Sequence, residues 1–264
     1  MQETLRIAGI QLDISWEDQE KNFQKVENFL PKLENFDLIL LPEMFSTGFS
    51  MKSLEFAEDK EGATESFLKH IAHKTGSLVG GGWIEKNGSA LPFNTFSLVS
   101  PTGVLARYRK IHPFSFAGED KFYTPGNELI VLDWKGWKLT PLICYDLRFP
   151  ESFRQTSGIT DLYLVIANWP SVRISHWLSL LEARALENQA YVFGLNRVGS
   201  AGRKEKLFHN GFSAIIDPWG RKSIDSGERE SLFSGSLSIV ELREIRAKNP
   251  YLKDIQGIKP IHYF

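Results

Sequence analysis

The sequence predicts an α/β fold in which two β-sheets pack on each other and helices cover their outer faces. Continuous apolar runs at 38–41 and 162–167 have the composition of strands that are buried on both faces. Amphipathic segments with helical spacing follow such strands. Because this series of strands and helices occurs twice along the chain, two layered sheets are favoured.

The first series starts at the N-terminus and ends in a β-hairpin. Its predicted elements are a strand at 5–14, a helix at 17–35, a strand at 38–41, a helix at 64–74, a strand at 77–86 and a hairpin at 94–112. Gly76 can end the second helix in the left-handed conformation. Pro101, Thr102 and Gly103 supply the turn of the hairpin.

The second series follows a looser segment at 113–129. It contains a strand at 139–143, a helix from Pro150 to about Gly158, a strand at 161–167, a helix at 176–191, strands at 192–199, 212–220 and 232–240, and a last helix at 240–248. Helical spacing places five residues on the inner face of the long helix: Trp177, Leu180, Leu181, Ala185 and Leu186. We expect one domain over 1–264, with a C-terminal arm at about 249–264 that lies on a partner subunit.

Composition excludes several classes of partner. Charged residues make up 24% of the 264 residues, and the formal net charge of -1 gives no field that would recruit nucleic acid or an anionic membrane. One cysteine excludes an internal disulfide framework. The N-terminal segment has no leader pattern, and no apolar run is long enough to span a membrane. These features predict a soluble cytoplasmic protein.

Motifs for nucleotides, metals and serine hydrolases are missing. VGGGW lacks the spacing of a dinucleotide fingerprint, and the sequence contains neither a GxxxxGK[ST] loop nor a GxSxG elbow. His70 and His73 lie three residues apart, but no HExxH or cysteine-rich ligand set accompanies them. We therefore expect no metal and no organic cofactor.

The single cysteine, Cys144, follows a predicted buried strand directly. A lone cysteine is often only a small buried hydrophobe, but the carboxyl ends of strands are where α/β proteins bind ligands. Glu43 and Lys110 also follow predicted strands. A carboxylate base, a cation for the oxyanion and a thiol nucleophile suffice for attack on an amide carbonyl. Taken singly, Glu43 could be a helix-entry acid and Lys110 a solvated charge.

Several segments together resemble the carbon-nitrogen hydrolase (nitrilase) superfamily in order and spacing. They are LLPEMF, RKIH, ICYDLRFPE, ANWP, the helix from His176 and FSAIIDPWG, so that the resemblance covers about 5–240. It implies a four-layer α-β-β-α sandwich, usually dimeric, with a catalytic set of Glu43, Lys110 and Cys144. A further glutamate of the superfamily corresponds to Glu119.

Within the superfamily, HPFSFAGEDKFYTPGN, NWP and Arg173 resemble ω-amidases of the bacterial type. That resemblance implies hydrolysis of 2-oxoglutaramate and 2-oxosuccinamate through a cysteine thioester. It also implies that Phe116, Tyr145, Trp169 and Arg173 bind the small amide, with Arg173 on the free carboxylate. Arg148 is expected to have a structural role in the turn.

The mechanism that follows uses Cys144 as nucleophile, Glu43 as general base, and Lys110 with the Tyr145 N–H as oxyanion donors. Glu119 would hold Lys110 or the substrate nitrogen. The sequence leaves open how far the thiol is ionised, because Lys110 lowers and Glu43 raises the pKa of Cys144. Carbamoyl amides, nitriles and other small amides remain alternative substrates, and a catalytically silent binding module is the alternative outside enzymes.

Overall fold

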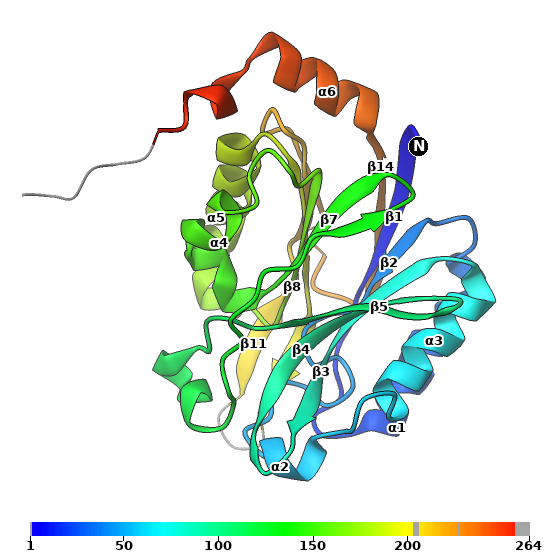
Figure 1. Cartoon of the computed structure of the whole chain (residues 1–264). Coiled ribbons are helices and arrows are strands. Elements are labelled where there is room, and N and C mark those ends of the chain that lie inside the picture. Colours follow the sequence, from blue (N-terminus) through cyan, green and yellow to red (C-terminus); the bar gives the residue numbers. More distant parts are fainter. Residues whose placement is uncertain (1, 203–205, 226, 257–264) are drawn as a thin grey trace, which may run out of the picture.

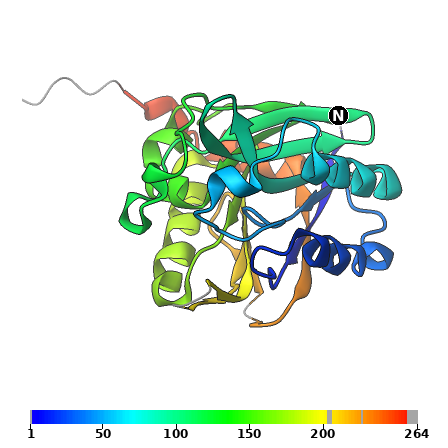
Figure 2. The ribbon, with the colours of Figure 1, turned by 90° about the horizontal axis from the view of Figure 1, so that it is seen from below.

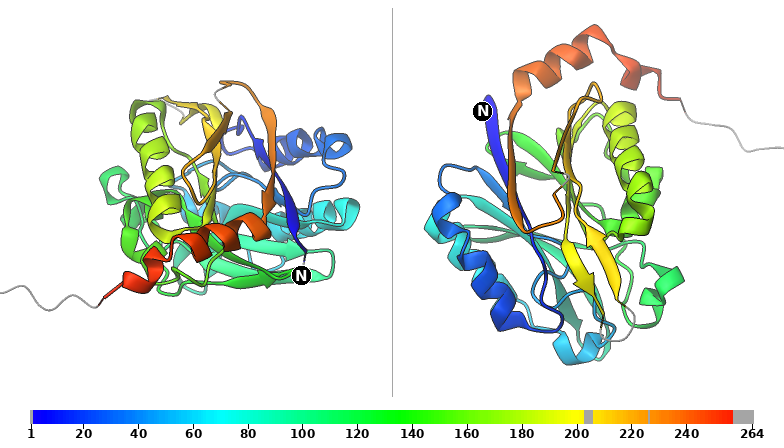
Figure 3. Two further views of the ribbon diagram at one scale, coloured as in Figure 1. Left: turned by 90° about the horizontal axis from the view of Figure 1, so that it is seen from above. Right: turned by 180° about the vertical axis from the view of Figure 1, so that it is seen from behind.

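The computed structural model describes residues 2–202, 206–225 and 227–256, and over these ranges the chain forms two six-stranded sheets and a separate two-stranded ribbon. The two sheets lie face to face with helices on their outer sides (Figure 1). The same order of layers is visible from below, with α5 on one side and α1 on the other (Figure 2), and from above and behind (Figure 3). The predicted two-sheet α/β sandwich is confirmed.

The first sheet has the strand order β14-β1-β2-β3-β4-β5. Its strands are β1 (Thr4–Gln11), β2 (Leu38–Leu40), β3 (Leu78–Asn87), β4 (Ala90–Ser100), β5 (Gly103–Arg109) and β14 (Ser231–Ser238). β1, β2 and β3 are parallel, and two antiparallel pairings then bring β5 back to the direction of β3. The carboxyl ends of β2 and β5 therefore lie at the same edge of the sheet.

The second sheet has the strand order β13-β12-β9-β8-β7-β6. Its strands are β6 (Leu132–Trp134), β7 (Trp137–Ile143), β8 (Leu162–Ala167), β9 (Tyr191–Asn196), β12 (Ser213–Ile216) and β13 (Lys222–Asp225), and the separate ribbon pairs β10 (Val198–Ala201) with β11 (Leu207–Asn210). β7, β8 and β9 are parallel, so their carboxyl ends also share one edge.

Helices cover the two outer faces. The α-helices are α1 (Gln19–Glu27), α2 (Ser53–Phe56), α3 (Ala63–Thr75), α4 (Pro150–Arg154), α5 (Ile174–Asn188) and α6 (Ile239–Lys248). The 3-10 helices are η1 (Leu30–Lys32), η2 (Ser115–Ala117), η3 (Glu119–Lys121), η4 (Cys144–Arg148), η5 (Ser171–Arg173) and η6 (Tyr251–Asp254). Across the described ranges, no helix has both the length and the apolar character of a membrane span.

The alternation of side chains along the strands divides the apolar residues between two cores. Ile7, Leu38 and Leu40 face the second sheet and belong to the large cluster between the sheets. Ile10 and Ile39 face the other way and pack under α1 and α3. The inter-sheet core brings the edges that carry the polar strand ends close to each other.

Some predicted boundaries were wrong. The helix expected at 17–35 ends at Glu27, because Pro31 has no N–H for a continuing helix and a 3-10 helix replaces it. The helix expected from Pro150 to Gly158 is regular only to Arg154. The run expected as one strand at 192–199 leaves the second sheet after Asn196 and continues as β10, and β6 was not predicted.

Two further expectations concern the helix at 176–191 and the arm. Leu186 was placed on the inner face of that helix, but it is 44% exposed, and Arg184 and Asn188 are buried there instead. The described part of the arm does not begin as extended chain, since Tyr251–Asp254 forms η6. The remainder of the predicted arm, 257–264, lies outside the described residues.

Candidate active site

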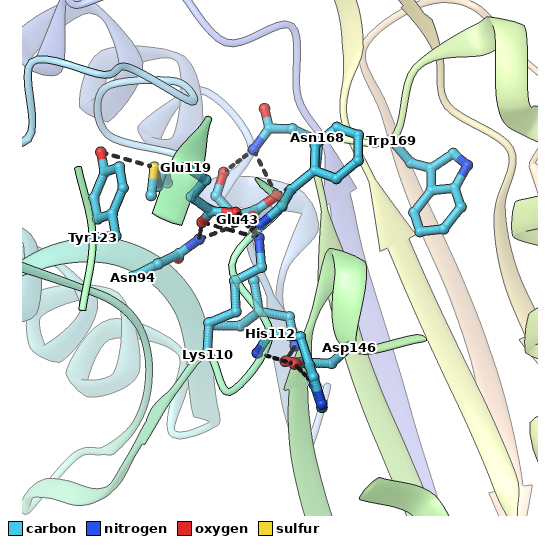
Figure 4. A network of polar contacts seen from close by, with 12 residues as sticks. Glu43, Asn94, Lys110, His112, Glu119, Tyr123, Asp146, Asn168 and Trp169 are labelled. Carbon is cyan, nitrogen blue, oxygen red and sulfur yellow. Dashed lines mark hydrogen bonds and ion pairs between the residues drawn. The ribbon is translucent and has the colours of Figure 1, made fainter. Parts of the chain in front are cut away.

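The four residues expected to perform the chemistry lie together between the two sheets. Figure 4 shows three of them, Glu43, Lys110 and Glu119. Glu43 and Lys110 follow β2 and β5 of the first sheet, and Cys144 follows β7 of the second. Glu119 begins η3 in the loop that connects β5 with β6. The site is therefore built from both halves of the sandwich.

Cys144 sits in a strained turn. It is the first residue of η4, and its φ of 46° lies in the left-handed region that a side chain with a Cβ rarely adopts. The buried carboxylate of Asp146 supports this turn, because its Oδ2 accepts hydrogen bonds from the Ile143 N–H at 3.0 Å and from the Tyr108 hydroxyl at 2.8 Å. Its Oδ1 accepts from the His112 N–H at 3.0 Å. Asp146 thus ties the cysteine turn to the end of β5.

Lys110 is shared by two carboxylates. Its Nζ lies 2.9 Å from Glu43 Oε1 and 2.8 Å from Glu119 Oε2, and the three side chains are at most 1% exposed. Asn94 donates from Nδ2 to both carboxylates, at 2.8 Å to Glu43 and 2.9 Å to Glu119. The expected contact between Glu119 and Lys110 is confirmed.

Asn168 holds the other side of Glu43. Its backbone N–H donates to Glu43 Oε2 at 2.8 Å, and its Nδ2 donates to the Glu43 carbonyl at 2.7 Å. Sequence reasoning missed Asn94 and Asn168, although ANWP had been singled out as a strand end. The signal for Asn168 was its position directly after β8, on the same edge as Cys144.

The electrostatics of the cluster separate the pKa values of its members. Burial alone would raise the pKa of Glu43, but Lys110 and the hydrogen bonds from Asn94 and Asn168 lower it below its ordinary value. Burial, with Glu43 nearby, raises the pKa of Glu119 despite Lys110. Burial would lower the pKa of Lys110, but the two carboxylates raise it well above its ordinary range.

The thiol responds in the opposite sense to Glu43. Cys144 is partly exposed as a residue, yet its sulfur is surrounded by protein atoms. Burial and the nearby Glu43 carboxylate raise the pKa of Cys144 well above its ordinary value, and Lys110 offsets only part of this effect. The resting pair at neutral pH is therefore a neutral thiol and an ionised carboxylate, a question that the sequence left open.

A pocket opens above the cluster, and we call it the Cys144 pocket. It is lined by Glu43, Phe49, Lys110, Phe114, Cys144, Tyr145, Arg148, Asn168, Trp169, Pro170 and Arg173. Three of the four residues expected to bind substrate, Tyr145, Trp169 and Arg173, are among them. Phe116, the fourth, does not line the pocket: it is 83% exposed, and Phe114 lies in the wall. Its part in substrate binding stays a prediction.

The mouth of the Cys144 pocket is ringed by aromatic and cationic side chains, which we call the collar: Phe114, Tyr145, Arg148, Trp169 and Arg173. The Arg173 guanidinium lies 5.5 Å from the Phe114 ring, and Phe114 is 4.8 Å from Tyr145. The Arg148 guanidinium lies 4.8 Å from the Trp169 ring, and the Trp169 indole N–H donates to the Arg173 carbonyl at 2.8 Å.

Arg148 lies in the pocket wall, which the sequence did not indicate. A structural role in the turn was expected and stays a prediction, and Arg148 also lines the Cys144 pocket beside Arg173. Within the described part of the chain, neither guanidinium forms an ion pair with a carboxylate. Besides its contacts with aromatic rings, Arg148 has a 3.2 Å contact with His176 Nδ1. Both cations are therefore available to an anionic group in the pocket.

Comparison with known proteins agrees with this geometry. The model of the carbon-nitrogen hydrolase family matches residues 6–247. The omega-amidase YafV of Yersinia enterocolitica is 38% identical over 253 residues, which cover 95% of this chain and 96% of the relative. The 2-oxoglutaramate amidase of Bacillus subtilis is 35% identical over 255 residues, with 95% and 97% of the two chains covered.

A solved structure is similar over nearly the whole chain. It is a CN-hydrolase superfamily protein from Xanthomonas campestris with an arsenic adduct in its active site. The TM-score is 0.92 and the identity 34%, and the match covers 98% of this chain and 100% of the other.

Proposed function

Because this chain belongs to the carbon-nitrogen hydrolase family, we propose that it is an ω-amidase which cleaves small 2-oxo dicarboxylic monoamides. The substrates would be 2-oxoglutaramate and 2-oxosuccinamate, and the products the corresponding 2-oxo acid and ammonia. The names of two relatives, an omega-amidase and a 2-oxoglutaramate amidase, support this assignment.

The observation that carries the proposal is the combination of groups in the Cys144 pocket. A thiol, a carboxylate and an ammonium group form its floor, and the collar above them presents two arginines that have no carboxylate partner among the described residues. A monoamide of a dicarboxylic acid has an amide at one end and a carboxylate at the other. The guanidinium fork suits such a carboxylate, and the floor suits attack on the amide.

The first step is proton transfer coupled to attack. Since the pKa of Cys144 is raised and that of Glu43 is lowered, Glu43 accepts the thiol proton as the sulfur bonds to the amide carbonyl carbon. The carbonyl oxygen becomes an oxyanion. Lys110 and the Tyr145 N–H stabilise that charge, and they need no rearrangement because Lys110 is already fixed by two carboxylates.

The tetrahedral intermediate then collapses. The C–N bond breaks, Glu43 returns the proton to the leaving nitrogen, and a thioester on Cys144 remains. Water, deprotonated by Glu43, attacks the thioester carbon, so that the C–S bond breaks and the thiol is restored. Glu119 keeps Lys110 oriented throughout.

The test is a panel of compounds assayed for ammonia release by wild-type protein, with Cys144→Ala protein as the blank. The panel contains 2-oxoglutaramate, 2-oxosuccinamate, butyramide, a ureido acid and an aliphatic nitrile. We expect the two 2-oxo monoamides to have kcat/KM values at least about tenfold above butyramide, as one charge-assisted contact provides. If kcat/KM is higher for the ureido acid or for the nitrile, the protein is a hydrolase of that compound class and the proposal is wrong. If no compound is turned over, the binding module is favoured.

A further inference from the structure

A second cavity adjoins the Cys144 pocket, and we call it the adjoining cavity. It has a volume of about 200 Å³. It shares five wall residues with the Cys144 pocket, namely Phe49, Phe114, Asn168, Pro170 and Arg173. Its own walls include Trp16, Met51, Ala117, Ala201, Leu207 and His209. A small amide that reaches Cys144 has no evident use for this space.

Arg173 belongs to the part of the adjoining cavity that is shared with the Cys144 pocket, and the part that is not shared suits a neutral apolar group. Most of its walls are aromatic or aliphatic side chains. Its histidine, His209, is uncharged at neutral pH, because burial and the nearby Arg197 lower the pKa of His209 to about 4. Apolar cavities of about 150 Å³ accommodate benzene. The adjoining cavity is therefore large enough for a phenyl or benzyl group.

The position of Asn168 indicates which part of a substrate would enter the adjoining cavity. Glu43 must return a proton to the leaving nitrogen, so that nitrogen lies beside the Glu43 carboxylate during collapse. Asn168 holds Glu43 through its backbone N–H and Nδ2, and it is a wall of both spaces. A substituent on the nitrogen would therefore pass Asn168 into the adjoining cavity.

The acyl end of such a substrate would bind in the Cys144 pocket and not in the adjoining cavity. Tyr145, Arg148 and Trp169 line the Cys144 pocket but not the adjoining cavity. Arg148 can take the carboxylate there, together with Arg173, which borders both spaces. The two ends of a substituted amide would thus occupy separate spaces.

We propose that this protein also hydrolyses secondary amides whose nitrogen carries an apolar substituent, with that substituent bound in the adjoining cavity. This inference rests on the proposed function, because the same acyl group and the same steps are used. The C–N bond of the thiol adduct breaks, Glu43 gives its proton to the departing amine in place of ammonia, and water then hydrolyses the thioester. No other reactant is required.

The test compares 2-oxoglutaramate with its N-benzyl derivative, measuring 2-oxoglutarate from both and benzylamine from the second. We expect wild-type protein to release benzylamine with a kcat/KM within about tenfold of that for the primary amide. Turnover of the primary amide alone would overturn this inference and leave the proposed function intact. No turnover of either compound would instead overturn the proposed function.

Variants that fill the adjoining cavity locate the substituent. Ala117→Phe and Met51→Trp should lower kcat/KM for the N-benzyl amide at least tenfold and change that for 2-oxoglutaramate less than twofold. Ala90→Phe is the matched control, since Ala90 is exposed at the start of β4 and lines neither space. Equal losses on both amides would show that the acyl group or the entry path uses the cavity, which contradicts the proposal.

Discussion

Arg107 and Arg109 extend from the outer face of β5, whereas Tyr108 and Lys110 extend from its inner face toward the second sheet. On the outer face each arginine makes two hydrogen bonds to one buried carboxylate, Arg107 to Glu65 at 2.8 and 2.9 Å and Arg109 to Glu85 at 3.0 and 2.7 Å. On the inner face one lysine serves two carboxylates. Cations adjacent in sequence, two within β5 and one directly after it, thus belong to two kinds of ionic cluster.

The difference lies in charge balance and solvent access. The outer pairs are neutral, and the arginine side chains remain 23% and 37% exposed. The inner cluster holds two carboxylates and one ammonium group, all buried, beside a thiol. Buried charge without balance costs folding free energy. We infer that the outer pairs serve stability and that the inner imbalance serves proton transfer.

The largest expected effect comes from removing the thiol beside the inner cluster. Cys144→Ala should reduce kcat for 2-oxoglutaramate by at least about 10⁴-fold, since no other group can form the thioester. The fold should remain, because a strand-end side chain fills little core volume. Ammonia release and circular dichroism measure the two effects. Soluble protein with unchanged specific activity would remove Cys144 from the reaction.

Glu43→Gln should have the next largest effect, a loss of kcat of about 10²–10⁴-fold. The amide keeps the shape of the side chain but cannot accept the thiol proton. The pH profile sharpens this test. A lowered pKa means that Glu43 stays ionised as pH falls through the ordinary glutamate value of about 4.3, so the acid limb of wild-type kcat/KM lies below that pH while the protein remains folded. Near wild-type kcat in the variant would identify another base.

Arg173→Ala tests a third kind of cation, one in the collar. The Arg173 guanidinium has no carboxylate partner in the described structure. We expect KM for 2-oxoglutaramate to rise at least tenfold, about 1.4 kcal/mol, and KM for butyramide to change much less. Arg148→Ala is the matched variant, because Arg148 lines the same pocket. If only Arg148→Ala shows the selective rise, the carboxylate contact belongs to Arg148; equal rises on both substrates would remove Arg173 from carboxylate recognition.

The smallest effect on turnover should come from the outer face. Arg107→Met leaves the buried Glu65 carboxylate with Ser97 but without its guanidinium, and we expect it to lower the free energy of unfolding by about 1–3 kcal/mol. Its kcat should stay within about threefold of wild type. Urea denaturation and steady-state kinetics measure these quantities. A hundredfold loss of kcat without destabilisation would contradict the division of β5 into two faces.

The stability lost in Arg107→Met should depend on pH in a defined direction. Burial alone would raise the pKa of Glu65, but Arg107 and Ser97 hold it below its ordinary value in the folded protein. A lowered folded-state pKa contributes stability above the unfolded pKa, and that stability disappears as pH falls through the folded pKa. The difference between wild type and variant should therefore shrink in acid. A difference that grows in acid would contradict this assignment.

The sequence predicted the parts of the site that are fixed by local pattern. Glu43, Lys110 and Cys144 follow predicted strands, and parallel strands bring such positions to one edge. Residue type could not show which of the two cations, Lys110 or Arg107, belongs to the site. The alternation of side chains along β5 does, because it places them on opposite faces of the sheet. Local pattern could not choose Phe114 over Phe116 as a wall residue, because both rings lie in an irregular segment with 3-10 helices, where no strand or helix periodicity assigns a face.

Amide partners were harder to predict than charged ones. Asn94 lies within β4, and only the folded arrangement places its Nδ2 between two carboxylates from distant segments. The position of Arg148 in the pocket wall was missed for a similar reason. Its place in a turn motif said nothing about the Trp169 ring that orients its guanidinium toward the pocket. Such contacts depend on tertiary packing.

The division of the site between the two sheets has a consequence for how activity is acquired during folding. Glu43 and Lys110 belong to the first sheet and Cys144 and Asn168 to the second, so neither half of the chain can form the site before the inter-sheet core closes. Pairings between residues so far apart in sequence form late, because their loop-closure entropy is paid first. The rate at which amidase activity recovers after dilution from denaturant then reports when the two sheets dock. This recovery should lag behind the recovery of secondary structure.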